Sequence, residues 1–339
     1  MKDYCVHIKR NDPRVKSIIS GMTEYDAWDY ESNIRNMTDE EWEELGRDIA
    51  MNTHFEKVEL FEGALNDHRM SCFFLGLTRS SSIERITLFD NQLSTAGVQS
   101  MVPFLQNANN LTYLDLDFNN IQSEGFNVLF RALRDSPIEK LSCENCRIES
   151  IEIIRENMPK HLEYLNLEGN SIKTDGCSEI AKLLQRGDAT LERLYLQEND
   201  IDDEGVEILV DALKSNTSLR ELCLMGNVMS KRGLIMLLKL VNDMSSIKAT
   251  YQSNHTLDLI HVIDPKEPFN ALDKIQQLIN VATGVNTQSQ NDPYKAGWVK
   301  VITYQLCSVL RGHSCRLRMS TIACSVRLTL YSYLRFLHW

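Results

Sequence analysis

Apolar residues in the middle of the chain follow two alternating periods. The segment LERLYLQENDI, which begins at Leu191, aligns with LTYLDLDFNNI from Leu111 in the pattern LxxLxLxxNxL. The alternation within LxL is the period of a β-strand. The pattern occurs seven times, and its first residues are Phe55, Ile83, Leu111, Ile138, Leu162, Leu191 and Leu219. Each copy therefore predicts one short strand followed by a turn.

A second pattern follows most of these strands. A glycine precedes apolar residues one, four and eight positions later, as in Gly205 with Val206, Leu209 and Leu213. This spacing places apolar side chains on one face of a helix. The same glycine recurs at Gly97, Gly125, Gly176 and Gly233. The unit that begins at Ile138 has Glu152 in place of the glycine and is the shortest, so we expect an abbreviated helix there.

The units begin 24 to 29 residues apart, which is typical of leucine-rich repeats. One such unit cannot bury its leucines alone, whereas stacked units share a continuous core. The run IDDEGVEILVDALKSN from Ile201, and Cys146 in place of the recurring asparagine, resemble the ribonuclease-inhibitor subfamily of leucine-rich-repeat proteins. We therefore expect an α/β solenoid, a curved horseshoe of about seven to eight repeats. Its parallel strands would form the concave face and its helices the convex face.

An asparagine recurs where the chain leaves five of the seven predicted strands. It is present at Asn91, Asn119, Asn170, Asn199 and Asn227. An amide side chain at this place can satisfy backbone groups that would otherwise be buried without partners. We therefore interpret these asparagines as structural.

The N-terminal region, residues 1–54, carries one clear signal. Thr38 and Glu41 have the spacing of a capping box, and Trp42, Leu45 and Ile49 follow on one helical face. They predict a helix from about Asp39 to Met51 that caps the end of the stack. Residues 1–36 predict no element.

The repeat array is expected to span residues 55–262. Its last unit, IKATYQSNHTL from Ile247, has Thr250 and Gln252 where other units have core leucines. We expect stacking to stop there. Residues 263–292 then predict a C-terminal cap helix with Leu272, Ile275, Leu278 and Ile279, followed by the polar linker TGVNTQSQND.

Charge divides the chain into two parts. Residues 293–339 hold seven Lys or Arg and no acid, so their formal charge is +7. Because the whole chain has a net charge of −11, residues 1–292 carry −18. This basic tail is either an amphipathic segment that docks on membranes or on the protein's own acidic face, or a mobile tail, or a translated intron or misassigned frame. The acidic balance elsewhere disfavours nucleic-acid binding.

Composition also indicates the compartment. The N-terminus has no apolar run suited to a signal peptide, and nowhere do eighteen consecutive apolar residues occur. The nine cysteines are scattered and odd in number, which favours reduced thiols. We expect a cytoplasmic protein that does not engage membranes, except through its basic tail.

The residues between the strand leucines should line the concave face, where curved solenoids usually bind partners. They include aromatic and acidic side chains at Glu59, Phe61, Phe89, Tyr113, Asp115, Asp117, Phe118, Glu144, Tyr164, Glu168, Tyr195 and Glu198. Aromatic rings supply contact area, and carboxylates pair with basic groups. The residues predict a surface for a basic protein or peptide. A merely solvated strand face is the alternative, and a parallel column of Lys57, Arg85, Lys140 and Arg193 can neutralise neighbouring acids.

Other motifs favour structural interpretations. Cys143 and Cys146 form a lone CxxC at positions that repeats use for Leu and Asn, which favours packing over a zinc or redox site. The LxxLL run from Leu234 to Leu238 coincides with the buried helix face. The sequence has no GxxxxGK[ST], HExxH or GxSxG motif. We expect no catalytic residues, no metal and no cofactor.

The sequence thus favours a non-catalytic scaffold for protein–protein interaction. Two further functions come from the resemblance. Similar repeats occur in the activating protein of the small GTPase Ran, although such activators have more repeats and an acidic tail. Inhibition of a ribonuclease is the other, and a shared fold does not fix a function.

Overall fold

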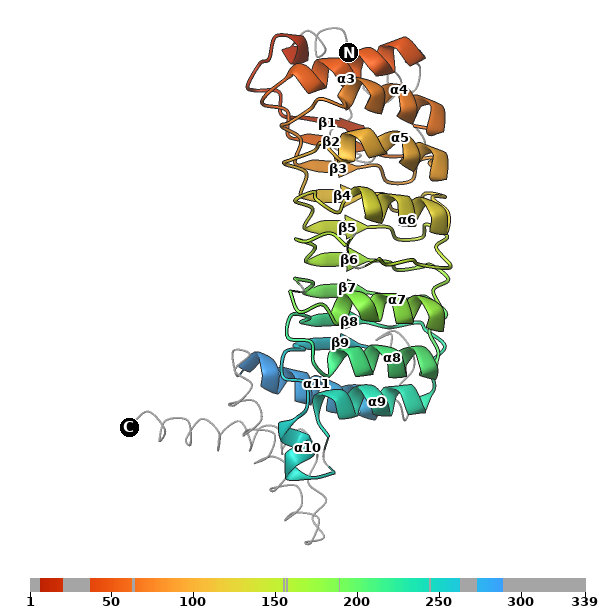
Figure 1. Cartoon of the computed structure of the whole chain (residues 1–339), viewed down its shortest axis with the longest axis vertical. Coiled ribbons are helices and arrows are strands. Elements are labelled where there is room, and N and C mark those ends of the chain that lie inside the picture. Colours follow the sequence, from red (N-terminus) through yellow and green to blue (C-terminus); the bar gives the residue numbers. More distant parts are fainter. Residues whose placement is uncertain are drawn as a thin grey trace, which may run out of the picture.

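The computed structural model describes residues 7–20, 37–62, 65–154, 156, 158–188, 190–243, 245–262 and 273–288. Strands line one side of an elongated stack and helices cover the other side (Figure 1). The strands form one parallel sheet in sequence order. They are β1 (Ser17–Ser20), β2 (Lys57–Leu60), β3 (Arg85–Thr87), β4 (Tyr113–Asp115), β5 (Lys140–Ser142), β6 (Tyr164–Asn166), β7 (Arg193–Tyr195), β8 (Glu221–Cys223) and β9 (Leu259–His261). The predicted α/β repeat solenoid is confirmed.

Helices fill the segments between most strands. They are α3 (Asp39–Met51), α4 (Asp67–Leu77), α5 (Thr95–Leu105), α6 (Gln122–Ala132), α7 (Thr174–Leu184), α8 (Asp203–Leu213), α9 (Lys231–Val241), α10 (Ile247–Tyr251) and α11 (Asp273–Gln288). None of the helices in the described ranges is long and apolar enough to cross a membrane.

The core lies between the sheet and the helices. In β4, Leu114 and the following Leu116 are fully buried, and in α8 the predicted positions Val206, Leu209 and Leu213 are buried as well. Full burial of one such side chain contributes roughly 1.5–3 kcal/mol before the entropy of ordering is subtracted. Every unit adds to the same core, which is why the units are stable only as a stack.

The recurring asparagines connect consecutive units through backbone hydrogen bonds. Asn119 Nδ2 donates to the carbonyl oxygens of Leu88 and Leu116 at 2.7 and 2.9 Å, and its Oδ1 accepts from the Leu93 amide at 3.2 Å. Asn91, Asn170, Asn199 and Asn227 make equivalent bonds. The structural interpretation of these residues is confirmed.

The unit after β5 differs from the others. The described residues between β5 and β6 form no α-helix, so the expected abbreviation goes further than a shortened helix. Ile151, Ile153 and Met158 are buried there in place of helical side chains. Among the described residues, the convex side of the stack consequently has no α-helix between α6 and α7 (Figure 1).

At the N-terminal end, the predicted helix has the expected bounds and capping box. Glu41 N donates to Thr38 Oγ1 at 3.3 Å, and Thr38 N donates to Glu41 Oε2 at 2.8 Å. Residues 1–36 carry no recognisable pattern, yet the structure places β1 there, and it pairs with β2 in parallel. Helix α3 therefore follows a strand, as in the other units, and the sheet extends beyond residue 55.

Helices α3 and α4 pack backbone against backbone. A Cβ atom at Gly46 would lie 2.2 Å from the Phe73 carbonyl oxygen, and one at Gly76 would lie 2.3 Å from the Glu43 carbonyl oxygen. Real Cβ atoms do not approach that closely, so only glycine allows this spacing. The two glycines fix the relative position of α3 and α4.

The strand of the last unit lies further along the chain than the pattern from Ile247 predicts. Ile247–Tyr251 is the short helix α10, and the final strand, β9, follows at Leu259–His261. Leu257, Ile260 and Val262 are buried in the LxxLxL pattern of the earlier units. The insertion that contains α10 lengthens this unit and displaces its strand from the expected register.

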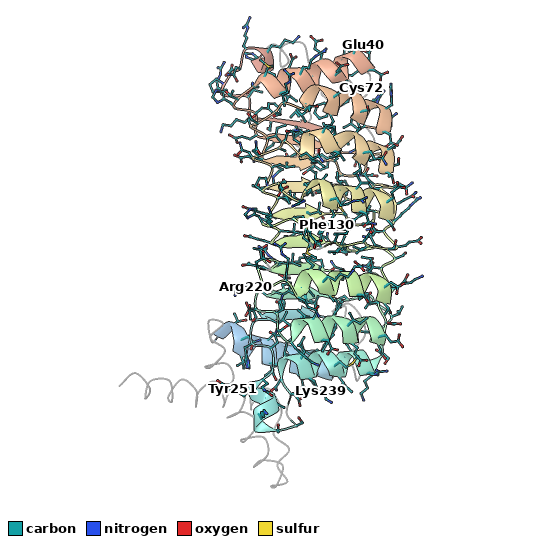
Figure 2. The ribbon with its side chains drawn as sticks, viewed as in Figure 1. Glu40, Cys72, Phe130, Arg220, Lys239 and Tyr251 are labelled. Atoms are coloured by element: carbon teal, nitrogen blue, oxygen red, sulfur yellow. The ribbon has the colours of Figure 1, made fainter. Side chains whose placement is uncertain are left out.

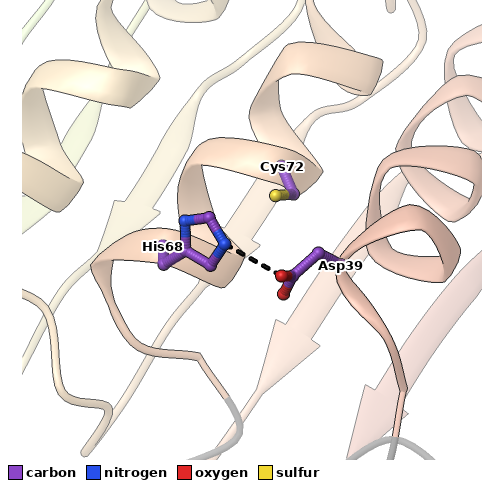
Figure 3. A group of neighbouring side chains, drawn as sticks. All are labelled: Asp39, His68 and Cys72. Carbon is purple, nitrogen blue, oxygen red and sulfur yellow. Dashed lines mark hydrogen bonds and ion pairs between the residues drawn. The ribbon is translucent and has the colours of Figure 1, made fainter.

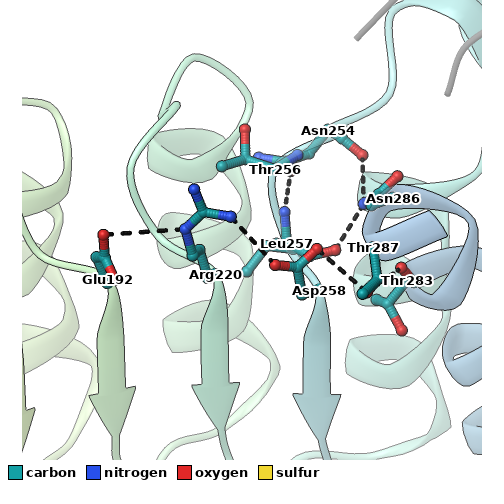
Figure 4. Close-up of polar contacts among 9 residues, drawn as sticks. All are labelled: Glu192, Arg220, Asn254, Thr256, Leu257, Asp258, Thr283, Asn286 and Thr287. Atoms are coloured by element: carbon teal, nitrogen blue, oxygen red, sulfur yellow. Dashed lines mark hydrogen bonds and ion pairs between the residues drawn. The ribbon is translucent and has the colours of Figure 1, made fainter. Parts of the chain in front are cut away.

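Helix α11 covers this end of the stack by packing against α9 and β9. Asn286 Nδ2 donates to the carbonyl oxygens of Leu257 and Asn254 at 2.6 and 3.4 Å (Figure 4). In the same network, Thr287 Oγ1 donates to Asp258 Oδ1 at 3.2 Å. Ile279 and Ala282 are buried in this contact.

The helix extends further than the sequence predicts. Thr283 to Gln288 lie inside α11, whereas the sequence predicts a polar linker there. Thr283 and Asn286 are buried, and the Thr283 hydroxyl donates to the Ile279 carbonyl oxygen at 3.1 Å. Polar residues read as a linker thus satisfy backbone groups. Leu272, the remainder of the linker and the basic tail 293–339 lie outside the described residues, and the four-region division of the chain stays a prediction.

Candidate protein-binding surface

Parallel register places equivalent residues of successive units in columns across the sheet. We call the sheet surface that faces away from the helices the concave face. Its first column runs through Lys57, Arg85, Tyr113, Lys140, Tyr164, Arg193 and Glu221, and its central column through Glu59, Thr87, Asp115, Ser142, Asn166, Tyr195 and Cys223. The third column follows the strand ends and contains Phe61, Phe89, Asp117, Glu144 and Glu168.

Three phenylalanines form a continuous row, which we call the aromatic stripe. The ring centroids of Phe61 and Phe89 are 6.1 Å apart, and those of Phe89 and Phe118 are 4.9 Å apart. Such separations are those of favourable aromatic pairs. The Phe118 side chain is nevertheless well exposed, at 42%. The stripe therefore offers apolar contact area at the N-terminal half of the concave face.

Phe118 adopts a backbone conformation that bulky residues rarely use. Its φ is +58°, in the left-handed region, and the position repeats with positive φ in every unit from β2 to β8. The other units place short, polar or glycine residues there, at Glu62, Asp90, Asn145, Gly169, Glu198 and Gly226. The left-handed turn brings the Phe118 ring beside Phe89, although the two residues differ in repeat position.

Next to the stripe lie four carboxylates, Asp115, Asp117, Glu144 and Glu168, which we call the acidic cluster. Asp115 and Asp117 were expected to be exposed, but they are only 9% and 8% exposed. Asp115 Oδ1 accepts from the Asp117 amide at 3.0 Å, and Asp117 Oδ1 accepts from the Glu144 amide at 2.7 Å. Neighbouring strands cover these side chains because strand spacing is short compared with their reach.

Polar residues from adjacent strands complete the acidic cluster. Asn166 Nδ2 donates to Ser142 Oγ at 3.1 Å and to Glu144 Oε2 at 3.3 Å. Gln197 Nε2 donates to Glu168 Oε2. Ser142, Asn166 and Gln197 are not among the residues predicted from the sequence. The register columns are the signal that could have identified them.

Burial makes the ionised forms of three residues in the acidic cluster less favourable. Burial, with the adjacent charge of Asp115, raises the pKa of Asp117 to about 7. Burial also raises the pKa of Asp115, while the Arg85 charge opposes that increase. Burial and the charge of Glu144 raise the pKa of Glu168. A cation placed near these groups would favour their ionised forms.

Three tyrosines border the acidic cluster. The Arg85 guanidinium lies 3.9 Å from the centroid of the Tyr113 ring, and Arg193 lies 5.9 Å from that of Tyr164. Tyr164 and Tyr195 have ring centroids 5.2 Å apart. Burial raises the pKa of Tyr113 and of Tyr164 to about 12, so both phenols stay neutral hydrogen-bond donors. Part of the basic column thus contacts aromatic rings.

Two predicted residues, Glu59 and Glu198, belong to none of these groups. Glu59 is half-buried in β2, and Glu198 is exposed in the turn after β7. Glu198 is close enough to contribute to the raised pKa of Glu168. The twelve predicted residues thus fall into an aromatic stripe, an acidic cluster, a group of tyrosines and two flanking glutamates.

The cysteine pair and the LxxLL motif belong to the core. Cys143 and Cys146 are fully buried, and Cys146 Sγ donates to the Leu116 carbonyl oxygen at 3.1 Å. Burial raises the pKa of the Cys143 thiol well above its usual range. Leu234 and Leu237 are buried as well. The packing interpretation of both motifs is confirmed.

Relatives share the repeat architecture. Human NACHT, LRR and PYD domains-containing protein 5 is 25% identical over 210 residues, which are 60% of this chain and 17% of that protein. Mouse ribonuclease inhibitor is 23% identical over 235 residues, 67% of this chain and 50% of the inhibitor. Pig ribonuclease inhibitor is 25% identical over 199 residues, 56% of this chain and 43% of the inhibitor. The chain thus spans half or less of these proteins.

A family model matches the middle of the chain. The model of the PRAME C-terminal domain covers residues 81–257, which is more than half of the chain and runs from the start of the β3 unit to that of the β9 unit. With the ribonuclease-inhibitor relatives, this match agrees with the repeat type that the sequence predicts. The chain is a leucine-rich-repeat protein that belongs to the PRAME C-terminal domain family.

Proposed function

We propose that this chain is a non-catalytic scaffold that binds a protein or peptide with a basic surface on its concave face, in the cytoplasm. One observation carries the proposal: the aromatic stripe and the acidic cluster are contiguous. The Phe118 amide donates to the Glu144 carbonyl oxygen at 2.8 Å, and Phe118 follows Asp117 directly in the chain. Apolar anchors and carboxylates therefore share one surface.

The chemistry of this surface favours a cationic partner. Exposed aromatic rings bury large areas at low cost in side-chain entropy, and they are frequent among dominant contacts of interfaces. Asp115, Asp117 and Glu168, whose pKa values are raised, gain from an arriving lysine or arginine because its charge stabilises their ionised forms. Long-range attraction would also speed the encounter.

The relatives support a protein partner as a class. Mouse and pig ribonuclease inhibitor are, by their names, proteins that act on an enzyme. Inhibition of a ribonuclease is therefore the second candidate for this chain. An assay of ribonuclease activity with increasing amounts of the chain tests it, and a panel of small GTPases tests the regulatory alternative through the rate of GTP hydrolysis.

Site-specific photo-cross-linking tests the leading proposal. A photoreactive phenylalanine analogue replaces Phe118 on the concave face, and the matched control replaces Leu75, which is 65% exposed on α4 of the convex face. We expect Phe118 to cross-link in cells to discrete proteins with basic surfaces that Leu75 does not capture. Identical products from both positions would contradict a concave binding site.

A further inference from the structure

Three side chains with metal-binding donor atoms meet at the N-terminal end of the convex face. Asp39 is the first residue of α3, whereas His68 and Cys72 lie on α4 (Figure 3). One carboxylate oxygen, one imidazole nitrogen and the thiol sulfur all lie within 4.8 Å of one another. His68 Nε2 is 2.9 Å from Asp39 Oδ2. The concave face and its proposed partner do not involve these residues.

Local sequence fixes the donors on each helix. His68 and Cys72 are four residues apart, so they lie one turn apart on one face of α4. Asn66 caps this helix by accepting from the Arg69 amide at 3.0 Å, one turn before Cys72. Asp39 follows the Thr38 capping box directly. The starts of both helices are therefore fixed by capping hydrogen bonds.

The packing of the two helices sets the distance between the donors. Gly46 and Gly76 bring α3 and α4 into backbone contact, and a Cβ atom at either position would collide. Such close packing leaves little freedom for the helices to slide. The donor atoms consequently converge without a partner to assemble them, which is the preorganisation that a binding site requires.

The donor set matches the preferences of zinc. Zn²⁺ binds thiolate, imidazole and carboxylate ligands at about 2.0–2.3 Å, and three protein ligands plus water form a common tetrahedral arrangement. Tetrahedral donors at those lengths are separated by roughly 3.3–3.8 Å. The side chains of His68 and Asp39 are 71% and 48% exposed, so they can rotate the short distance that this geometry requires.

The surrounding charge also favours a cation. Burial raises the pKa of the Cys72 thiol, and the carboxylates of Asp39, Glu43 and Glu40 raise it further. Figure 2 shows Glu40 and Cys72 at this same end of the stack. The negative potential that discourages a bare thiolate attracts a divalent ion, whose charge would offset the repulsion.

We propose that Asp39, His68 and Cys72 bind a divalent transition-metal ion of the zinc type, with water as a further ligand. The ion would connect α3 to α4. Because the donors come from α3 and α4, the site would stabilise the N-terminal end of the solenoid. Thiol, imidazole and carboxylate together favour zinc over calcium or magnesium, which prefer oxygen ligands.

Cobalt spectroscopy on the full chain tests this site. The chain is treated with a chelator, kept reduced with a phosphine and titrated with Co²⁺ alone, and the near-ultraviolet thiolate-to-cobalt absorption is recorded. We expect the Cys72→Ser variant to lose the absorption that one bound Co²⁺ ion per chain contributes. His68→Gln should weaken the binding of this Co²⁺ ion about tenfold or more. Zn²⁺ added to the wild type should displace the cobalt.

A matched control separates this site from other thiols and histidines. His7 forms a similar pair with a carboxylate, its Nδ1 lying 3.0 Å from Asp12 Oδ2. His7→Gln should therefore bind cobalt as the wild type does. Zn²⁺ should raise the melting temperature of the wild type and of His7→Gln more than that of His68→Gln. Equal cobalt spectra and equal zinc stabilisation of wild type and His68→Gln would overturn the proposal, even if Cys72→Ser failed to fold.

Discussion

The rings of Phe89 and Phe118 lie 4.9 Å apart although the two residues occupy different positions of their repeats. Phe89 directly follows the last strand leucine of its unit, Leu88, whereas Phe118 stands one residue further from Leu116. The positive φ of Phe118 compensates for this offset. The aromatic stripe is therefore built partly by backbone geometry. It adjoins the acidic cluster through the Phe118 amide, which donates to Glu144.

The asparagine bonds between units should contribute measurably to stability. Asn119→Ala removes the partners of the Leu88 carbonyl and the Leu93 amide in a buried place. We expect the free energy of unfolding to fall by about 1–3 kcal/mol. Asn109, which is exposed, supplies the control, and Asn109→Ala should change stability by no more than about 0.5 kcal/mol. Denaturant unfolding measures both, and equal effects would contradict the role given to Asn119.

Glycine should matter at the contact between α3 and α4. Gly46→Ala places a Cβ atom against the Phe73 carbonyl oxygen, so we expect a loss of about 1–3 kcal/mol in stability. Gly284 lies in α11 with no atom within 4 Å of an added Cβ. Gly284→Ala should therefore stabilise the protein by about 0.5–1 kcal/mol through helix propensity. Thermal melts distinguish the two, and stabilisation by Gly46→Ala would disprove the close packing.

Acidic pH should favour the fold through the Asp115–Asp117 pair. The pKa of Asp117 is about 7 in the folded chain, above its unfolded value of about 4. Between these values the folded state binds more protons, so stability falls as pH rises from about 4 to about 7. Asp117→Asn, which keeps an acceptor for the Glu144 amide, should lessen this fall in denaturant unfolding.

Asp135 should change the pH dependence of stability in the opposite direction to Asp117. Its pKa is lowered, chiefly by a hydrogen bond from Lys160, so its contribution is present above the unfolded pKa and is lost as pH falls. Asp135→Asn should therefore lose stability relative to the wild type only above about pH 4. A pH dependence that is identical in the wild type and Asp117→Asn would refute the buried pair.

Asn286 should hold α11 against the end of the sheet. Asn286→Ala removes the donor to the Leu257 and Asn254 carbonyl oxygens, whereas Thr287→Ala removes a bond to the Asp258 side chain and one to the Thr283 carbonyl oxygen of the same helix. Faster amide exchange in α11 and β9 is expected for Asn286→Ala, with a smaller change for Thr287→Ala. Hydrogen-exchange mass spectrometry makes the comparison, and equal protection in both variants would argue against this anchor.

The regular units were predictable because each carries its own pattern. Thr38 and Glu41 specified the helix from Asp39 to Met51, and the strand leucines and helix glycines specified most other elements. The two end strands were missed for physical reasons. Strand β1 has Ser20 where other units have an apolar residue, and the insertion with α10 displaces β9.

The surface was harder to predict than the core. Sequence alternation placed Asp115 and Asp117 on the concave face, but their burial depends on neighbouring strands that alternation does not describe. The Phe118 contact depends on a left-handed residue, and the Asp39–His68 contact on the crossing of two helices. Each of these features arises between units, where the pattern of a single unit carries no information.

The central claim is that the concave face binds a basic partner. Its most direct measurement is the affinity of a cross-linked partner, once identified, for the wild type, for Phe118→Ala/Glu198→Lys and for Leu75→Ala. Phe118, Glu198 and Leu75 are all exposed, so the thermal melts should stay nearly unchanged. We predict that the double variant loses about tenfold or more in affinity, with a weaker salt dependence, and that Leu75→Ala binds like the wild type. Unchanged affinity of the double variant would contradict the claim.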